Sequence, residues 1–309
     1  MKKITIVILN YNGWGDTNEC LESLKPIIES TTFDVKLVVV DNKSKNESIS
    51  RISEKIAKLF PNRFVITDNI IEATKSRVVL FCSNINFGFS GGNNIGIKIA
   101  RQNKSDYVLL LNNDTTVEPN FLHPLVDAIQ ESGVGIVGPK IKDYYDRYQF
   151  ILGGDFKRLK CTGVHYYNTE EYNHKPVSFL SGCCWLISMD AIEECGLMDE
   201  NYFLYVEDVD YCYRFHTLGY KLIPVGESVI YHKEGRSTTV KPMLYYYNTR
   251  NRLYFCKKNK YKAVAKVCFH TYLLCNRVYV AIRNNKTIKY IKQAYCDFFN
   301  NKFGPLITL

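Results

Sequence analysis

Short apolar runs alternate with helical patterns through the first half of the chain, and this alternation limits the fold more than any other feature. The runs that predict buried strands are residues 4–9, 35–40, 77–82, 107–111 and 135–137. The patterns that predict helices are residues 17–28, 47–60, 93–101 and 119–131. Repeated strand–helix units favour an α/β fold with a mainly parallel central sheet.

Polar residues follow several of these strands at the point where each strand ends. They are Asn10-Tyr11-Asn12, Asp41-Asn42, the stretch from Asn84 to Asn94, and Asn112-Asn113-Asp114. Ligands of open α/β sheets bind at the carboxyl ends of the strands, so we expect a binding site at this edge.

The second half of the chain is organised differently. Residues 140–175 are rich in Tyr, Gly and charge without clear periodicity, and we expect an irregular, partly mobile region there. Residues 178–188 and 221–231 are strand-like, and residues 199–219 contain a helix. Two further helical patterns, at residues 245–257 and 263–283, lie in a basic tail. We therefore expect a sheet domain at residues 1–238 and a basic, helical C-terminal region at 239–309.

One motif is misleading. Residues 133–138 match G-x-G-x-x-G, but Pro139 follows where a nucleotide-binding helix would begin, and the motif comes after a helix instead of the first strand. No P-loop motif is present either. These features argue against a dinucleotide-binding dehydrogenase and a P-loop nucleotidase.

The stretch Asn86-Phe87-Gly88-Phe89-Ser90-Gly91-Gly92-Asn93-Asn94 is a glycine- and amide-rich loop before a helix. Small residues let a backbone approach a ligand, and a helix N-terminus offers free N–H groups to an anion. A polar turn with a helix cap is the competing interpretation.

Asn112-Asn113-Asp114 ends an apolar strand with a carboxylate and neighbouring amides. These oxygens suit a hard divalent cation that also holds phosphates, although a strand-ending turn explains one carboxylate equally well. Asp41 is suited to accept hydrogen bonds from a ribose or base, or to serve as a turn residue.

Glu207-Asp208-Val209-Asp210 places three acids in four positions after an apolar run. A carboxylate near a helix start is stabilised as the anion and suits a general base, although capping clusters are common. His232 closes a later strand as a candidate metal ligand or a packed side chain. Trp185 fits either the core or a stacking platform for a sugar.

Taken together, these segments resemble the family 2 inverting glycosyltransferases of the GT-A fold, and specifically their rhamnosyltransferase-like branch, which builds bacterial surface polysaccharides. The matching pieces, in family order, are Ile6-Val7-Ile8-Leu9-Asn10-Tyr11-Asn12-Gly13, Val38-Val39-Val40-Asp41-Asn42-Lys43-Ser44, the loop from Asn86 to Asn94, Leu110-Leu111-Asn112-Asn113-Asp114, Gly182-Cys183-Cys184-Trp185, Tyr205-Val206-Glu207-Asp208-Val209-Asp210 and Tyr231-His232. The resemblance covers the chain to about residue 240.

The resemblance implies a GT-A nucleotide-sugar-binding fold and a nucleoside-diphosphate sugar bound across the early strand ends. The donor would be dTDP-rhamnose or a UDP-sugar. The donor-binding residues implied by the resemblance are Asn10, Tyr11, Asn12, Asp41, Asn86, Gly88, Gly92, Asn93 and Asn113. Trp185 would face the acceptor, a hydroxyl of a glycan or of a lipid-linked oligosaccharide.

The resemblance also assigns the chemistry. Asp208 matches the catalytic base, with Glu207 inseparable from it by spacing alone. Asp114 matches the last carboxylate of the family's D-x-D motif, which is written Asn-Asn-Asp here, and His232 matches a later metal ligand. The implied cofactor is Mg²⁺ or Mn²⁺, which would neutralise charge on the leaving diphosphate.

The charge of the chain is unevenly distributed. From Lys241 onward 14 Lys and Arg stand against one acid, whereas the rest of the chain has 26 basic and 30 acidic residues. This asymmetry indicates an anionic partner for the tail: a membrane surface, a nucleic acid or a phosphorylated substrate. Basic residues interrupt the apolar pattern of residues 264–283, which fits an interfacial amphipathic helix on an anionic membrane. The alternative is a helical subdomain or a contact between copies of the chain. We expect no nucleic-acid binding, because no recognised motif for it is present.

Eleven cysteines occur without a Cys-x-x-Cys pair, which is typical of reduced core cysteines in a cytosolic protein. We therefore expect a cytoplasmic enzyme, peripheral on the inner face of the cell membrane. The competing functions are a UDP-hexose or UDP-N-acetylhexosamine transferase with another acceptor, and a non-catalytic sugar-nucleotide binder whose tail binds nucleic acid.

Overall fold

The structure is a computed structural model that describes residues 1–233 and 242–306. The boundary expected between residues 238 and 239 lies outside the described residues. The strands are β1 (Lys3–Asn10), β2 (Asp34–Asp41), β3 (Phe64–Thr67), β4 (Val78–Cys82), β5 (Tyr107–Asn112), β6 (Thr115–Val117), β7 (Val134–Asp143), β8 (Phe150–Lys157), β9 (Thr162–Tyr167), β10 (Cys184–Ser188) and β11 (Lys221–His232). The α-helices are α1 (Trp14–Glu29), α2 (Ser48–Leu59), α3 (Ile70–Ala73), α4 (Gly88–Gln102), α5 (Leu122–Ile129), α6 (Met189–Cys195), α7 (Glu207–Thr217), α8 (Pro242–Lys258), α9 (Ala263–Arg283) and α10 (Ile288–Phe299).

One sheet organises the molecule, with strand order β3-β4-β2-β1-β5-β10-β7-β11-β6 and the β8–β9 hairpin attached to β7. β1 to β5 are joined in parallel, and β10 runs antiparallel to both β5 and β7. β7 and β11 are again parallel, and β6 is antiparallel to β11. The predicted α/β fold with a mainly parallel sheet is confirmed.

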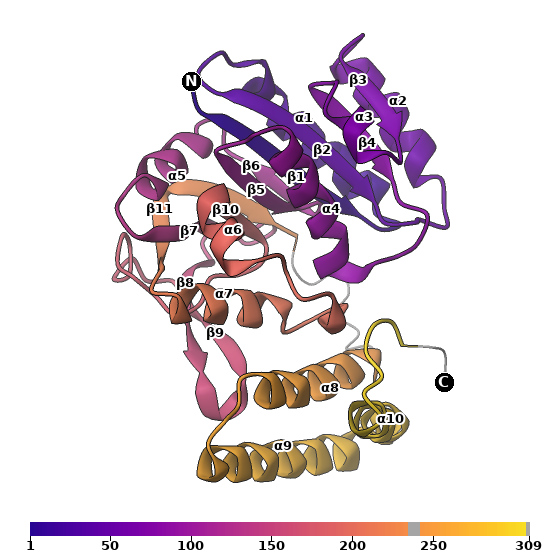
Figure 1. The fold of residues 1–309 in the computed structure, drawn as a ribbon, viewed down its shortest axis with the longest axis vertical. Helices are drawn as coiled ribbons and strands as arrows, with labels where there is room; N and C mark the ends of the chain where they lie inside the picture. Colours follow the sequence, from indigo (N-terminus) through magenta and orange to yellow (C-terminus); the bar gives the residue numbers. More distant parts are fainter. Residues whose placement is uncertain (234–241, 307–309) are drawn as a thin grey trace.

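Helices cover both faces of the sheet because successive side chains of each strand point to opposite sides (Figure 1). In β1, Ile4, Ile6 and Ile8 join the core beneath α1, α2 and α5. Val7 joins the opposite core, beneath α4, α6 and α7. Both faces of the strand are therefore buried, which is why its sequence is continuously apolar.

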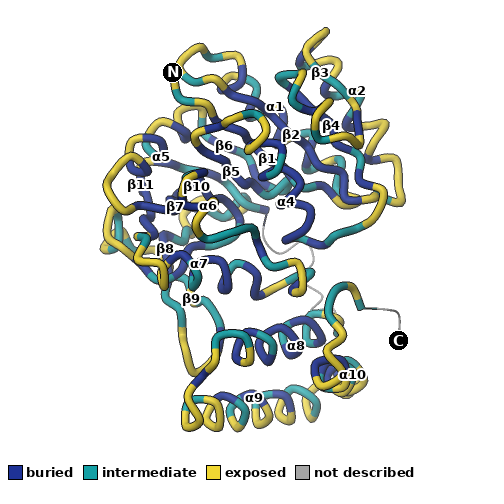
Figure 2. The backbone as a smooth tube through the Cα atoms, viewed as in Figure 1, coloured by how far each residue is buried: buried dark blue, intermediate teal, exposed yellow. Residues whose placement is uncertain are grey.

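The C-terminal helices α8, α9 and α10 lie beneath the sheet domain at one end of the molecule (Figure 1). Leu253 and Phe255 of α8 and Phe269 and Leu273 of α9 are buried in the same core cluster as Val7. The tube coloured by burial shows α8 buried along much of its length and α9 exposed on its outer side (Figure 2). Among the described helices, none combines the length and apolar character needed to cross a bilayer.

The expected irregular region at residues 140–175 is wrong in part. β7 continues to Asp143, and β8 and β9 form an antiparallel hairpin. The hairpin is only partly buried, and its register shifts near Gly153, which has φ +74°. Because the hairpin is half exposed and its register shifts, apolar and polar residues do not alternate regularly along its strands.

Three helix or strand boundaries also differ from expectation. α4 begins at Gly88, so most of the predicted glycine loop is the first turns of a helix. α5 begins at Leu122 and not at Pro119, and the strand expected from residue 178 begins at Cys184. The G-x-G-x-x-G match lies largely inside β7, so no helix follows it.

Gly96 of α4 tests the packing between this helix and the sheet. A Cβ at Gly96 would lie 2.3 Å from Cγ1 and 2.5 Å from Cγ2 of Val7. We expect Gly96→Ala to lower the free energy of unfolding by about 1–3 kcal/mol, because overpacking a core displaces its neighbours. Denaturant unfolding measures this change.

The control is Gly15→Ala in α1, where nothing lies within 4 Å of the added Cβ. This substitution should be neutral or should stabilise the fold by up to about 1 kcal/mol, because alanine favours the helix. Equal effects at the two glycines would contradict the close approach of α4 to β1.

Candidate active site

Asn10 and Asp41 end the neighbouring strands β1 and β2 and lie opposite each other in the parallel register. Asn10 Nδ2 donates to Asp41 Oδ2 at 2.7 Å, and Ser44 Oγ donates to the same oxygen at 2.6 Å. The backbone N–H of Ser44 donates to Asp41 Oδ1 at 2.9 Å. Asp41 is 0% exposed, so its first role is to hold the loop after β2 in place.

Tyr11 and Asn12 follow Asn10 in a tight turn. Asn12 adopts φ +59°, its N–H donates to Ser44 Oγ at 2.8 Å, and its Oδ1 accepts from the N–H of Lys45 at 2.7 Å. Tyr11 is 45% exposed. The turn therefore presents one aromatic ring to solvent at the carboxyl end of β1.

Asn86 and the glycines of α4 pack mainly against the protein. Asn42 Nδ2 donates to Asn86 Oδ1 at 2.9 Å, and Asn86 Oδ1 also accepts from the N–H of Gly88 at 2.8 Å. A Cβ at Gly92 would lie 2.3 Å from Leu9 Cδ1. Asn93 is 2% exposed, and its Nδ2 donates to the carbonyl of Phe89 at 3.0 Å.

The expectation that small residues open this loop to a ligand therefore needs correction. Gly88 has φ +70°, and a Cβ there would lie 2.2 Å from the carbonyl oxygen of Phe203. Gly88 and Gly92 are required for contact with the segment before α7 and with β1, respectively.

Asp114 and His232 are brought together by strand pairing. β6 pairs with the end of β11, so that His232 lies opposite Thr115. His232 Nε2 and Asp114 Oδ1 are 3.2 Å apart. Asn113 Nδ2 donates to Thr17 Oγ1 at 2.9 Å, and Thr17 in turn donates to Asn10 Oδ1 at 3.0 Å. The ends of β1 and β5 are thus linked by hydrogen bonds.

Asp114 and His232 each favour the charged form of the other. Burial acts to raise the pKa of Asp114, but the close contact with His232 and its charge outweigh burial and lower this pKa. Burial acts to lower the pKa of His232, but Cys183 and Asp114 outweigh it and raise the pKa to about 11. A metal ion on His232 would therefore have to replace a proton.

The pair fits a divalent cation as two of its ligands. Asp114 Oδ1 is buried and, in the described part of the chain, accepts no hydrogen bond of good geometry beyond its ion-pair contact. Those same residues contain no group of three or more His, Cys, Asp or Glu that could hold a metal. A carboxylate and an imidazole would leave the other positions of Mg²⁺ or Mn²⁺ to phosphate and water.

Glu207 and Asp208 are the first two residues of α7. Asp208 is partly buried, and its Oδ1 accepts from the N–H of Val209 at 2.8 Å. Burial raises the pKa of Asp208 to about 6, although N–H groups of Val209 and Gly182 act in the opposite direction. Burial and the charge of Asp208 raise the pKa of Glu207 well above its usual range, and Glu207 Oε2 has no hydrogen-bond partner within the described residues.

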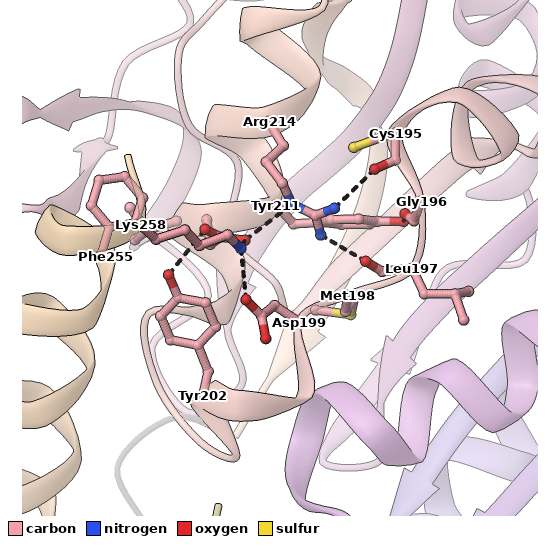
Figure 3. Close-up of polar contacts among 12 residues, drawn as sticks. Cys195, Gly196, Leu197, Met198, Asp199, Tyr202, Tyr211, Arg214, Phe255 and Lys258 are labelled. Carbon is pink, nitrogen blue, oxygen red and sulfur yellow. Dashed lines mark hydrogen bonds and ion pairs between the residues drawn. The ribbon is translucent and has the colours of Figure 1, made fainter. Parts of the chain in front are cut away.

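The third acid of this cluster, Asp210, has a different environment. Figure 3 shows Tyr202, Arg214 and Lys258, three residues that donate hydrogen bonds to it. The side chain of Asp210 is 1% exposed and accepts from Tyr202 Oη at 2.9 Å, Arg214 Nε at 3.0 Å and Lys258 Nζ at 2.8 Å. Lys258 also donates to Asp199 Oδ2 at 2.7 Å. Asp210 is therefore a satisfied anion that joins α7 to α8, whereas Glu207 and Asp208 have no cationic partner in the described structure.

Asp208 and the Asp114–His232 pair border the same short segment. A Cβ at Gly182 would lie 3.1 Å from Cβ of Asp208. The next residue, Cys183, accepts from the N–H of Asn112 at 2.9 Å and is also a neighbour of His232. Asp208 and the Asp114–His232 pair thus both adjoin residues 182–183, between β5 and the start of β10.

Trp185 does not join the site as a stacking platform. It is 0% exposed in β10, and its ring packs 6.0 Å from the ring of Tyr211. A sugar can stack only on an exposed aromatic face, so the core interpretation of Trp185 is the one that the structure supports.

Sequence reasoning missed a pair of residues in α8, Arg250 and Asn251, both 0% exposed. Asn251 Nδ2 lies 2.8, 2.8 and 2.7 Å from the carbonyl oxygens of Tyr202, Leu204 and Tyr205, so its two N–H groups are shared among three acceptors. Arg250 donates to the carbonyl of Tyr202 at 3.0 Å. No local pattern reveals this role, because the acceptors are backbone atoms almost 50 residues away in sequence.

The segment that these residues hold has a strained backbone. Phe203, Tyr205 and Val206 have φ values of +62°, +66° and +74°, which side chains other than glycine rarely adopt. The same segment contacts Gly88 and leads directly into Glu207. Strain of this kind persists only where surrounding contacts enforce it, and it is typical of functional sites.

The fold is that of the GT-A glycosyltransferases, as solved structures similar to it show. The mannosyltransferase PcManGT from Pyrobaculum calidifontis, solved with GDP-Man and Mn²⁺, aligns with a TM-score of 0.59 at 13% identity over 97% of this chain and 87% of that one. Staphylococcus aureus TarS 1–349, solved with UDP-GlcNAc, aligns with a TM-score of 0.58 at 16% identity over 96% of this chain and 80% of that one.

The chain belongs to glycosyl transferase family 2, whose family model matches residues 5–196. It is 26% identical over 209 residues to the low-salt glycan biosynthesis hexosyltransferase Agl10 of Haloferax volcanii, covering 63% of this chain and 66% of the relative. It is 29% identical over 153 residues to the N-acetylglucosaminyl-diphospho-decaprenol L-rhamnosyltransferase of Mycobacterium tuberculosis, covering 44% and 50%. It is 21% identical over 239 residues to the dTDP-rhamnosyl transferase RfbF of Shigella flexneri, covering 74% and 79%. The chain thus spans about half to two thirds of the length of the first two relatives.

Asn251→Ala tests the contact between α8 and the strained segment. Removing the amide leaves the carbonyls of Leu204 and Tyr205 without this donor, whereas the carbonyl of Tyr202 keeps its bond from Arg250. We expect the free energy of unfolding to fall by about 1–3 kcal/mol. Because these carbonyls belong to residues 202–205, amide hydrogen exchange should accelerate most at residues 203–209.

The matched control is Asn248→Ala on the same helix, where Nδ2 makes one intrahelical hydrogen bond, to the carbonyl of Leu244 at 3.2 Å. This control should leave the exchange of residues 203–209 unchanged. The same uniform acceleration in both variants would contradict a local role for Asn251.

Proposed function

We propose that this protein is an inverting glycosyltransferase that transfers a sugar from a nucleoside-diphosphate donor to a hydroxyl of a glycan or lipid-linked acceptor. The observation that carries the proposal is the position of Asp208, a partly buried carboxylate beside the segment that contacts β5 and His232. Residues 1–238 would carry the reaction, and the C-terminal helices would support it.

The donor is proposed from the relatives. The names of two of them specify rhamnosyl transfer, one from dTDP-rhamnose and one to a polyprenol-linked sugar. We therefore favour dTDP-rhamnose, with a UDP-sugar as the alternative, and a lipid-linked acceptor in surface polysaccharide synthesis. Transfer of a UDP-hexose or UDP-N-acetylhexosamine to another acceptor is the main competing activity.

The donor would lie across the carboxyl ends of β1, β2 and β5. Tyr11 is exposed there, and Asn10, Asn12 and Asp41 hold the turns that would surround the base. Asn113, at the end of β5, would lie nearer the diphosphate, between Thr17 and Asp114. Asn86, just before α4, would position Asn42 by accepting its hydrogen bond.

Asp208 would act as the general base. Its carboxylate takes the proton of the acceptor hydroxyl while the acceptor oxygen forms a bond to the anomeric carbon. The bond from that carbon to the diphosphate oxygen breaks on the opposite side, so the nucleoside diphosphate leaves and the configuration inverts. A pKa of about 6 leaves Asp208 mostly ionised at neutral pH and more basic than an ordinary aspartate.

Asp114 and His232 would hold Mg²⁺ or Mn²⁺, which when bound neutralises negative charge on the leaving diphosphate. In the absence of metal, the charged His232 holds Asp114 in place at 3.2 Å. Nucleotide and metal are therefore expected to bind together at this pair.

Asp208→Asn tests the base directly. We expect turnover to fall by about 10²–10⁴-fold, the usual contribution of a general base, while nucleotide binding is retained. Release of nucleoside diphosphate, with a panel of dTDP-, UDP- and GDP-sugars as donors, measures turnover and identifies the donor. Glu207→Gln is the matched control, and a larger loss there than at Asp208 would transfer the role of base to Glu207.

The raised pKa of Asp208 also predicts how pH affects activity and stability. Activity should rise as pH increases through about 6, because the base must be ionised. The folded protein holds the proton more tightly than the unfolded chain, so this residue destabilises the fold as pH rises from about 4 to 6. Asp208→Asn should therefore raise the melting temperature at neutral pH, and the gain should disappear below pH 4. A gain of the same size at every pH would contradict the raised pKa.

Asp114→Asn tests the proposed metal ligand by binding alone. Thermal unfolding with nucleoside diphosphate, with and without Mn²⁺, should show metal-dependent stabilisation of the wild type. The variant should lose that increment and keep the nucleotide-only shift, since its donor turns remain intact. An unchanged Mn²⁺ increment in the variant would exclude Asp114 as a metal ligand.

A further inference from the structure

Helix α9 has apolar residues on two opposite faces. The apolar residues Phe269 and Leu273 are buried on the side that faces α8, together with Arg277. The other side faces away from the body of the molecule and is exposed along its length (Figures 1 and 2). A helix that covers a core normally presents charged or polar residues on its outer side.

The outer side of α9 carries no charged residue over almost the whole helix. Its residues fall within an arc of about 140° at roughly 100° per residue. They are Val264, Val267, Cys268, Thr271, Leu274, Cys275, Val278, Tyr279 and Ile282, and we call this set the outer stripe. Val264 is 77% exposed, Val267 65% and Ile282 80%. Contiguous exposed apolar surface of this kind marks an interaction site.

The charged residues at the two ends of α9 and just beyond its C-terminus are basic. Lys262 precedes α9 and Arg283 ends it, and both are exposed, whereas the exposed Lys266 lies on the side of Leu273 and Arg277, away from the stripe. Beyond Arg283, Lys286, Lys289 and Lys292 line a hollow of about 520 Å³.

The one acid after Lys241, Asp297, is buried and accepts hydrogen bonds from Tyr246 and Gln293. The described C-terminal helices therefore have no exposed acid to offset these cations.

This charge pattern distinguishes between two occupants of the outer stripe. An antiparallel pair of α9 helices would place Lys262 at the start of one copy near Arg283 at the end of the other, and a parallel pair would place like residues together. Neither arrangement offers an acid to compensate, so charge opposes self-association. An anionic lipid surface complements both the apolar stripe and its basic surroundings.

We propose that the outer stripe of α9 docks on the surface of an anionic membrane, with its apolar side chains in the headgroup region and the surrounding lysines and Arg283 on lipid phosphates. The helix lies in the plane of the surface, in keeping with the finding that no described helix can span a bilayer. This inference rests on the surface of α9 and not on the proposed sugar transfer.

Docking at α9 would also orient the candidate active site. α9 packs on α8 through Phe269 and Leu273, and α8 holds the segment before α7 through Asn251. A short chain of buried contacts therefore connects the membrane-facing helix to Asp208. If the acceptor is lipid-linked, this arrangement keeps the base close to the surface that carries it.

Co-sedimentation with vesicles of phosphatidylcholine, with and without phosphatidylglycerol, tests the proposal on the full chain. We expect the wild type to bind the anionic vesicles, and binding to weaken at high salt because charge contributes. The double variant Val267→Glu/Leu274→Glu should bind on the order of tenfold or more weakly, since two buried apolar contacts are lost and two repulsive charges are added.

The matched control is Ile66→Glu/Ile71→Glu, which changes two isoleucines that are 45% and 69% exposed on the sheet domain. This control should bind vesicles like the wild type. Unchanged melting temperatures would show that both double variants are folded, and unchanged nucleotide binding would show that the donor site is intact.

Three outcomes would overturn the proposal. The first is a wild type that binds no anionic vesicle. The second is equal binding by the outer-stripe variant and the wild type. The third is a wild-type dimer in light scattering that becomes a monomer in the outer-stripe variant without any vesicle binding, which would make α9 a contact between copies.

Discussion

The strained backbone of residues 203–206 is the point on which the candidate site depends. Val206 is β-branched and has φ +74°, a conformation that costs free energy unless neighbouring contacts enforce it. The contacts come from two separate elements: the N–H of Phe89 in α4 donates to the carbonyl of Phe203 at 2.6 Å, and Asn251 in α8 binds three carbonyls. The direction in which α7 begins, and with it the position of Asp208, is therefore set by α4 and α8 together.

This dependence changes the role expected of the C-terminal region. Composition alone presents it as a basic appendage, with 14 Lys and Arg against one acid. In the structure, Arg250 is a large, fully buried cation whose donors are used by backbone carbonyls, Tyr246 and Asn251. A buried guanidinium is tolerated only when its hydrogen bonds are satisfied. α8 thus belongs structurally to the site, and the excess positive charge lies further out, around α9.

The sequence predicts the parts of this molecule that depend on local pattern. Buried parallel strands such as β1 are continuously apolar, and polar residues mark their carboxyl ends, so the sheet and the edge holding Asn10 and Asp41 follow directly. The nearness of Asp114 to His232 depends on the pairing of β6 with β11, which no local pattern encodes. Resemblance to a family supplied that pair. Neither resemblance nor pattern indicated Asn251, because its partners are backbone carbonyls, which residues of every type have.

Burial and pairing distinguish the acids at the start of α7 where spacing cannot. Asp210 has two cationic neighbours and a tyrosine hydroxyl, so its charge is fully compensated inside the protein. Glu207 and Asp208 have no such cation among the described residues, and their raised pKa values follow from burial. Carboxyl groups whose pKa is raised by burial, without a cationic partner, occur more often at functional sites than elsewhere. Asp210 has cationic partners and its two neighbouring acids have none in the described part of the chain. This difference is the physical argument for chemistry at the N-terminus of α7.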